Sequence, residues 1–554
     1  TTVTWTATNV NNGLMSTATQ LVTVRDSVKP TIYLNASVVN TLGIKGATSS
    51  QTPYLQSLKA GVYFKSLMSV PDTINGYRSV GIPDGLGAFD NNDGTFTLLM
   101  NQELGNTVGV TRAHGAKGAF VSKWVIRKSD LSVLSGSDLI KQVYGWNATT
   151  QANNTTTSTI AFNRFCSADL PSSTAFYNAN TGKGSLERIF MHGEEGSATG
   201  YQLGTVVTGA DSGKAYILGK FNLSTNGSGL TGVGAWENAL ACPYVQDKTI
   251  VVGPSDGGTG IMNNSVPVYI GTKQKTGTEV DKAGLNNGVV RFVKVVGNPT
   301  ESVNATTHAT NITNGTAFVL DDDSSTVFLR PEDGAWDPND ASKFYFATTD
   351  RLDSVMDFNR GQIGRSRLWR LNFTDIANPE LGGTIDILLD GTEGANMMDN
   401  FGIDKLGHIF LQEDVGNADH NGKIWQYTIA TDQLELIGKH DISRFGNVVN
   451  GTVTAATSPY NKDEESSGMI DMSDILGAGW HIFVDQAHSG TGLSTEAVEH
   501  GQLLAAFIPS SVSNTAATAN DTVRVTATGC NTTVALGTPA TGDNCSVASV
   551  TNNA

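Results

Sequence analysis

Charged residues, cysteines, histidine clusters and long apolar runs are all scarce in this sequence, and each scarcity excludes a class of protein. Charged residues make up only 16% of the 554 residues, and the helix-favouring Lys and Glu are few, which argues against a helical bundle. No run of about twenty apolar residues occurs, so we expect no membrane-spanning segment. The net charge of −16 argues against a nucleic-acid or anionic-membrane partner.

Familiar catalytic motifs are missing as well. The 9 histidines are scattered, without the spacing of a zinc site. Neither a Gly-x-Ser-x-Gly nucleophile elbow nor a Walker loop occurs. A His-based metal site, an elbow-type serine hydrolase and a P-loop nucleotide enzyme are therefore not indicated.

The residues that are abundant favour strands and turns. Gly occurs 61 times, and Thr, Asn and Ser are plentiful. Strand-like runs recur through the middle of the chain, for example at 95–100 and 344–348, and turn signals such as Asn92-Asp93-Gly94 separate them. Residues 398–439 have the up-and-down order of one propeller blade of about 40 residues. We therefore expect an all-β fold, with a β-propeller of six blades over residues 33–510.

The two ends of the chain have a different pattern. Residues 1–8 and 17–24 alternate polar and apolar side chains around a turn at 9–13, which predicts a hairpin within residues 1–32. This segment resembles the second half of a HYR domain, an immunoglobulin-like extracellular module. Residues 511–554, with Gly-Cys-Asn-Thr-Thr-Val at 529–534, resemble its first half. The resemblance implies a split immunoglobulin-like β-sandwich at the two termini.

Half a sandwich exposes an apolar face and a strand edge, so something must complete it. The two ends could meet within one chain. The tail of one chain could instead pair with the head of the next, which would propagate a filament. The ends could also be cut parts of neighbouring immunoglobulin-like modules in a longer surface protein. The chain begins Thr-Thr-Val-Thr-Trp without a signal-peptide pattern, so we expect a processed end or a cut edge.

Four cysteines are present, and they fall into two kinds of context. Cys530 and Cys545 lie close together in a strand-and-turn region and predict a local disulfide, worth roughly 3 kcal/mol for such a loop. Cys166 and Cys242 lie far apart in the sequence. They could form a second disulfide, remain two buried thiols, or comprise a metal ligand and a bystander. Together with sequons such as Asn147-Ala-Thr, the predicted disulfide indicates an extracellular or cell-surface protein.

The segment Arg330-Pro331-Glu332-Asp333 concentrates groups that carry chemistry. The guanidinium is a planar fork that suits a phosphate or a carboxylate. The two carboxylates are oxygen ligands for a hard cation. A turn with a surface salt bridge would explain the segment in isolation, but other carboxylate-bearing strand ends are predicted to meet it.

Those strand ends carry a second resemblance. The central region is similar, over most of residues 70–505, to the PhoX-type alkaline phosphatases, which are secreted propellers with an iron–calcium active site. The similarity rests on separated motifs at residues 98–105, 165–168, 192–195, 235–238, 330–333, 398–400, 463–468 and 485–488. Their order and number are fairly specific for the family, and less so for the activity.

The resemblance implies a ligand set. Cys166 stands at the position of the family's thiolate ligand to iron, and Arg330 at that of the arginine facing phosphate. Carboxylate positions fall on Glu194, Glu237 and Glu332, and the calcium candidates are Glu103, Asp399 and Glu465. The implied cofactors are Ca²⁺ and Fe³⁺, because thiolate suits iron whereas carboxylates serve both metals.

Structural explanations compete with each of these roles. Cys166 could be a buried apolar thiol, Glu194 and Glu195 could be solvated, and the calcium candidates could cap loops. The acidic segments at 90–94 and 321–323 resemble calcium loops but fit hairpin turns better. The family has Asn-His-Glu where this chain has Asn101-Gln102-Glu103, and Gln cannot titrate near neutral pH as His does.

Three hypotheses follow from the sequence. The first is a secreted, calcium- and iron-dependent phosphoric ester hydrolase, either a monoesterase or a diesterase. The second is a structural subunit that polymerises head to tail through the split immunoglobulin-like domain, with the propeller displayed. The third is a calcium-stabilised propeller that binds glycans or surfaces without catalysis.

Overall fold

Strands dominate the part of the chain that the computed structural model describes, which is residues 2–8, 15–21, 43–196, 198–304, 309–350, 366–416, 420–449 and 452–511. Among these residues no helix is longer than four residues. The short helices are α1 (Ser173–Phe176), α2 (Glu279–Lys282), α3 (Ile442–Phe445), α4 (Ser473–Leu476), η1 (Gly260–Met262), η4 (Pro379–Leu381) and η5 (Pro509–Ser511). The predicted all-β class is confirmed.

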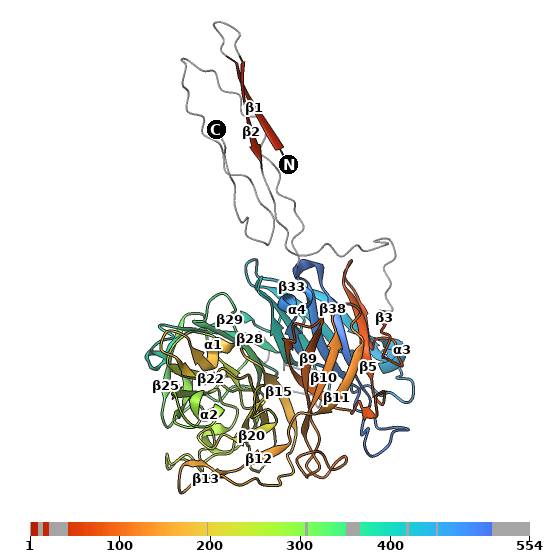
Figure 1. The fold of residues 1–554 in the computed structure, drawn as a ribbon. Helices are drawn as coiled ribbons and strands as arrows, with labels where there is room; N and C mark the ends of the chain where they lie inside the picture. Colours follow the sequence, from red (N-terminus) through yellow and green to blue (C-terminus); the bar gives the residue numbers. More distant parts are fainter. Residues whose placement is uncertain are drawn as a thin grey trace.

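The strands of residues 43–511 form six blades (Figure 1). In each blade the inner strands are antiparallel and consecutive in the chain, and some blades add an outer strand from elsewhere in the sequence, of which β12 and β3 pair in parallel. The innermost strands are β8 (Pro83–Asp90), β15 (Phe165–Asp169), β21 (Leu240–Ala241), β26 (Pro331–Trp336), β30 (Met398–Ile403) and β36 (Glu465–Asp471). Each contacts the next, and β36 contacts β8, so the ring closes. The expected six-bladed propeller is therefore observed.

The remaining strands complete the blades outward from these inner strands. The first and second blades add β9 (Thr95–Gln102), β10 (Phe120–Arg127) and β11 (Val133–Asp138), and then β18 (Ile189–Glu194), β19 (Gln202–Val206), β20 (Lys214–Ile217) and β12 (Gln142–Tyr144). The third and fourth add β22 (Lys248–Val252), β23 (Pro267–Thr272) and β24 (Val289–Val295), and then β27 (Lys343–Thr348), β28 (Arg367–Phe373) and β29 (Gly383–Leu389). Strand β25 (Thr316–Asp321) pairs with both β24 and β29 and joins these two blades into one nine-stranded sheet.

The last two blades join distant parts of the chain. The fifth contains β31 (His408–Glu413), β32 (Lys423–Thr428), β33 (Gln433–His440) and the early strand β4 (Leu55–Ser57). The sixth contains β37 (Trp480–Gln486), β38 (Gly501–Phe507), the early strand β5 (Tyr63–Ser69) and β3 (Ile44–Lys45). Because β5 is hydrogen-bonded to β38, backbone pairing between the two ends of the propeller closes the ring.

The direction of β38 sets where the propeller's own ends lie. Its first residue, Gly501, pairs with Gln486, level with the start of inner strand β36. Its last residue, Phe507, pairs with Tyr63, the first residue of β5. The chain thus enters β5 and leaves β38 at the end of the sixth blade that is opposite to the start of β36.

Short two-stranded ribbons decorate the blades and connections. They are β6 (Thr73–Ile74) with β7 (Tyr77–Arg78), β13 (Trp146–Asn147) with β14 (Ala152–Asn153), β16 (Tyr177–Asn178) with β17 (Lys183–Gly184), and β34 (Asn447–Val449) with β35 (Thr452–Thr454). The acidic segment after β8 is a hairpin turn, in which the Asp93 carboxylate accepts the Thr95 N–H at 2.9 Å. The turn interpretation of this segment is confirmed.

Apolar clusters fill the spaces between neighbouring blades. Trp124 of the first blade packs with Ile482 of the sixth, and Trp369 of the fourth packs with Val293 of the third. Similar clusters occupy the other four interfaces. Burying one large apolar side chain stabilises the folded state by roughly 1.5–3 kcal/mol. The buried side chains at the six interfaces therefore hold neighbouring blades together.

At the N-terminus, β1 (Thr2–Thr8) pairs antiparallel with β2 (Met15–Leu21), from Thr2 opposite Leu21 to Thr8 opposite Met15. The predicted hairpin is thus present, although its second strand lies at Met15–Leu21 and was predicted at 17–24. The segment at 520–551, the pair Cys530 and Cys545, and hence the split immunoglobulin-like domain and any filament contact lie outside the described residues. In the described part of the chain, none of the helices is long and apolar enough to cross a membrane.

Candidate metal centre

Every blade places one ligand-type side chain at the start of its inner strand. These six residues are Asp84, Cys166, Glu237, Glu332, Asp399 and Glu465. Four of them are the second residue of β8, β15, β26 and β30, one is the first residue of β36, and Glu237 precedes β21 by three residues. Because the inner strands are neighbours around one axis, these side chains converge at one end of the propeller.

A second row of acids comes from the adjacent strands. Glu103, Glu195 and Asp414 each follow directly after β9, β18 and β31, which run antiparallel to the inner strands and end beside their starts. Inner-strand and second-row residues form four overlapping groups, and within each group the ligand atoms lie within 4.8 Å of one another. The groups are Asp84–Glu103–Cys166, Cys166–Glu195–Glu237, Glu237–Glu332–Asp399 and Asp399–Asp414–Glu465. We call these nine residues the acidic ring.

The acidic ring lines a cavity of ≈ 650 Å³ together with Arg164, Arg330 and His488. Arg330 forms an ion pair with Asp256 and lies 3.0 Å from Glu332 Oε1. Arg164 Nη2 lies 2.5 Å from both Glu103 Oε1 and Glu195 Oε2. The cavity therefore combines many carboxylates with two guanidinium groups.

Burial and mutual repulsion raise the pKa of six carboxyl groups of the acidic ring and of its thiol. Burial, followed by repulsion from neighbouring carboxylates, raises the pKa of Asp84, Glu237, Glu332 and Asp399 well above the ordinary range. Burial raises the pKa of Glu103 to about 7 even though Arg164 lowers it, and burial with Glu465 raises that of Asp414 to about 7. Burial also raises the pKa of the Cys166 thiol. Full ionisation of this centre requires added positive charge.

The donor set fits bound cations. Among the described residues, Asp84 Oδ1, Glu237 Oε1 and Asp399 Oδ1 are buried oxygens without a hydrogen-bond partner. Leaving such an acceptor unpaired costs about 1–3 kcal/mol, which a metal ion would recover. The carboxylate oxygens suit calcium, and the Cys166 sulfur, 3.2 Å from Glu195 Oε2, suits iron.

Six of the seven metal ligands predicted from the sequence are in the acidic ring. They are Glu103, Cys166, Glu237, Glu332, Asp399 and Glu465. Glu194 lies outside these groups: its carboxylate accepts the N–H of Asn163 at 2.9 Å and the hydroxyl of Thr199 at 2.7 Å. The neighbouring Glu195 takes the place expected for Glu194, because successive side chains at a strand end point to opposite sides.

Sequence reasoning missed Asp84, Asp414 and Glu195 as ring members, and it missed Arg164. The available signal was position: Asp84 and Asp414 occupy the places in their blades that Glu332 and Glu103 occupy in theirs. That signal becomes visible only once the strands are aligned, since the surrounding residues differ from blade to blade.

Two open points about neighbouring residues are also decided. Cys166 and Cys242 are both free, buried thiols, so the alternative of a disulfide between them is wrong. Cys242 belongs to the apolar cluster between the third and fourth blades. Gln102 does not line the cavity, and its amide lies 3.1 Å from the Ser122 hydroxyl within the first blade. Gln102 is therefore not a member of the acidic ring.

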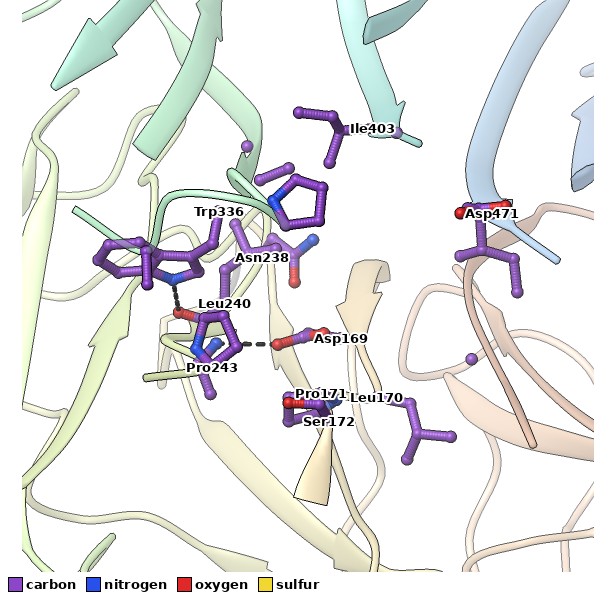
Figure 2. Close-up of a pocket in the computed structure, with 18 of the residues that line it drawn as sticks. Asp169, Leu170, Pro171, Ser172, Asn238, Leu240, Pro243, Trp336, Ile403 and Asp471 are labelled. Carbon is purple, nitrogen blue, oxygen red and sulfur yellow. Dashed lines mark hydrogen bonds between the residues drawn. The ribbon is translucent and has the colours of Figure 1, made fainter. Parts of the chain in front are cut away.

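A second cavity, of ≈ 1240 Å³, lies further along the inner strands and shares no lining residue with the first. The residues that follow the ring members line it, including Ser167, Asn238 and Asp333. Figure 2 shows Asp169 and Asn238 facing this space beside Trp336. The Asn238 amide donates to Asp333 Oδ1 at 2.7 Å, and Ser167 bonds to Asn400. These hydrogen bonds form a floor directly beneath the acidic ring.

Comparison with known proteins supports the fold. No family model matches the chain, and no curated protein matches it. Among solved structures, it is similar to Pseudomonas fluorescens PhoX in complex with vanadate, a transition state analogue. The TM-score is 0.55 at 11% identity, covering 85% of this chain and 99% of that chain. That likeness shows the shared β-propeller fold.

Two further solved structures score much lower. They are an AtxE2 isopeptidase variant with Astexin3-dC4 bound and a europium-containing methanol dehydrogenase. Their TM-scores are 0.19 and 0.21, at 9% and 10% identity; they cover 73% and 72% of this chain, and 57% and 67% of their own chains. TM-scores this low do not indicate a shared fold.

Proposed function

We propose that this protein is a metal-dependent phosphoric ester hydrolase whose active centre is the acidic ring with Arg330 at its edge. One observation carries the proposal: all six blades converge ligand-type side chains on one cavity that also holds a guanidinium. The fold shared with PhoX, which was solved with vanadate, agrees with this chemistry.

The residues divide by donor type between the two expected metals. Asp84, Glu103, Asp399, Asp414 and Glu465 would hold calcium, because all of their donor atoms are carboxylate oxygens. Cys166, Glu195 and Glu237 would hold iron, because they include the thiolate. Such cations supply Lewis acidity toward phosphoryl oxygens and activate an oxygen nucleophile.

Arg330 would bind the phosphoryl group and stabilise the charge that develops during transfer. Its backbone has a φ of 62°, and its carbonyl accepts the Thr349 N–H at 3.0 Å. Asp256 and Glu332 hold the guanidinium from two sides, which leaves Nη1 without a hydrogen-bond partner among the described residues. The arginine is thus oriented before substrate binds, which lowers the cost of ordering it.

A buried ion-pair network supports the loop that carries Arg330. Glu301 accepts the Leu329 N–H at 2.8 Å and pairs with the fully buried Arg367 at 3.1 Å. Arg367 also lies 3.3 Å from Asp350. Removing one partner of such a buried pair costs about 3–5 kcal/mol, so this network fixes the loop firmly.

The direct test compares Arg330→Ala and Glu332→Gln with the wild-type protein in hydrolysis of an aryl phosphate, after loading with calcium and iron. We expect both variants to lose activity while keeping the wild-type circular dichroism spectrum. Glu435→Gln is the matched control, since this carboxylate lies on the outer part of the fifth blade, with a side chain 49% exposed. Full activity in both ring variants would refute the proposal.

We also infer an extracellular location. Calcium sites made of several carboxylates fill readily at the millimolar calcium concentrations outside cells. Measuring calcium affinity by isothermal titration tests this, and a site that stays empty at millimolar calcium would contradict it.

A further inference from the structure

The same strained turn introduces the inner strand in four of the six blades. The residue two positions before the ring member has a positive φ in each: Ile82 (53°), Arg164 (47°), Arg330 (62°) and Met397 (53°). A positive φ is uncommon for residues other than glycine, and each instance costs about 1 kcal/mol or more. Its recurrence at one structural position shows that the fold uses this turn to bring the chain into the inner strand.

This position points residues at the metal cavity. Ile82, Arg164 and Arg330 all line it. Two blades of the four therefore carry an arginine at equivalent places, one two residues before Cys166 and the other two residues before Glu332. Arg164 is the structural counterpart of Arg330.

The side-chain contacts of Arg164 resemble those of Arg330, because each guanidinium lies beside two carboxylates. Its backbone already ties the neighbouring loops together, because its N–H donates to Leu104 O and its carbonyl accepts the Glu195 N–H, both at 2.9 Å. Its side chain is 49% exposed, although Nη2 lies 2.5 Å from Glu103 and Glu195. Glu103 and Glu195 are buried, with side chains 8% and 14% exposed, whereas the exposed half of the Arg164 side chain lines the cavity, where a bound anion can meet it.

The two arginines flank the same part of the acidic ring. Glu237 belongs to two ligand groups, one with Glu195 and the other with Glu332. Arg164 contacts Glu195, and Arg330 contacts Glu332. An anion bound over Glu237 therefore lies between the two guanidinium groups.

We propose that Arg164 is a second anion-binding residue of this centre, and that it makes the centre selective for phosphate monoesters over diesters. This inference rests on the proposed hydrolase function. A monoester at alkaline pH carries two negative charges on three terminal oxygens, whereas a diester carries one charge on two. Two guanidinium groups therefore attract the doubly charged monoester more strongly than the singly charged diester, and the third terminal oxygen lets both arginines bind it as planar forks.

The test compares Arg164→Ala and Arg164→Lys with the wild-type protein, all loaded with calcium and iron. Hydrolysis of 4-nitrophenyl phosphate is measured beside that of bis(4-nitrophenyl) phosphate, and inorganic phosphate binding is measured by isothermal titration. Arg127→Ala is the matched control, because this arginine pairs with Asp130 on the first blade and its side chain is 47% exposed.

We expect Arg164→Ala to lower kcat/KM for the monoester about 100-fold and to weaken phosphate binding, with a much smaller loss for the diester. Arg164→Lys keeps the charge without the fork and should recover part of the monoester activity. The melting temperature of Arg164→Ala should fall, because two buried carboxylates lose their ion-pair partner. Metal content should stay at the wild-type value, which separates anion binding from metal binding.

Two results would overturn the inference in distinguishable ways. Equal losses on both esters, or unchanged phosphate binding, would show that Arg164 only holds Glu103 and Glu195. A metal-loaded wild-type protein that neither hydrolyses the esters nor binds phosphate would overturn the hydrolase function itself, and this inference with it.

Discussion

Replacing Asp414 by Asn tests whether the buried carboxylates of the acidic ring destabilise the protein when no cation is bound. Burial and the neighbouring Glu465 raise the pKa of Asp414 from its ordinary value of 3.8 to about 7. A carboxyl group with a higher pKa in the folded state binds more protons there, so its contribution to stability falls as the pH rises from about 4 to 7. Between pH 5 and pH 8 this group removes about 3 kcal/mol of unfolding free energy from the metal-free protein, at 1.36 kcal/mol per pKa unit.

Asp414→Asn should abolish that loss while keeping the local geometry. The retained Oδ1 can still accept the Gly416 N–H, which lies at 2.9 Å. Urea unfolding in excess chelator at pH 5 and pH 8 measures the effect. Asp322→Asn is the control, because this carboxylate pairs with Arg291 at the surface and its side chain is 74% exposed.

Calcium should reverse which of the two proteins, wild type or Asp414→Asn, is the more stable. At a calcium concentration of about 100 Kd, binding adds roughly 2.7 kcal/mol to the wild-type protein, and the variant, lacking one ligand charge, gains less. We therefore expect Asp414→Asn to be the more stable protein at pH 8 without calcium and the less stable one with it. Equal pH dependence of wild type and variant in chelator would refute the electrostatic reasoning, and an unchanged order with calcium would refute the metal role.

Three further predictions probe other parts of the molecule. Cys166→Ser should lower bound iron and leave bound calcium unchanged in elemental analysis, because a hydroxyl is a poorer ligand for iron than a thiolate; unchanged iron would remove the thiolate from the centre. Burial lowers the pKa of His440, but Asp485, 2.8 Å from Nε2, raises it to about 9 overall. His440→Gln should therefore cost about 3 kcal/mol below pH 6.5, with the gap closing as the pH rises through 9, and a gap independent of pH would contradict this. A Cβ on Gly85 would lie 2.3 Å from Ala168 N in the next blade, so Gly85→Ala should destabilise by about 1–3 kcal/mol in urea unfolding, and a neutral effect would show that the blades can separate.

Local pattern was enough to predict the fold class. Alternating strands and turn residues such as Asn92-Asp93-Gly94 act over a few residues, so their signals are visible in the sequence. Closure of the ring was not predictable in this way. The pairing of β5 with β38 joins segments more than four hundred residues apart in the sequence. Neither strand has a sequence feature that identifies the other as its partner.

Site residues that stand in distinctive motifs could be predicted from the sequence. Those whose role depends on the arrangement of the folded strands could not. Glu237 and Glu332 stand in motifs that are unusual for strand ends, whereas Asp84 follows Pro83 and precedes Gly85 in what reads as an ordinary turn. The choice between Glu194 and Glu195 depends on which side of β18 each side chain leaves, and a shift of one residue exchanges the two. That information belongs to the register of the folded sheet.

The direction of β38 has a practical consequence. Gly501 lies level with the start of β36 and hence with the acidic ring, whereas Phe507 and its partner Tyr63 lie at the far end of the blade. Anything attached beyond Phe507 is joined to the propeller on the side away from the cavity mouth. Many copies could therefore be tethered to a solid support or a carrier protein through the end of β38, with every cavity still facing the surrounding liquid.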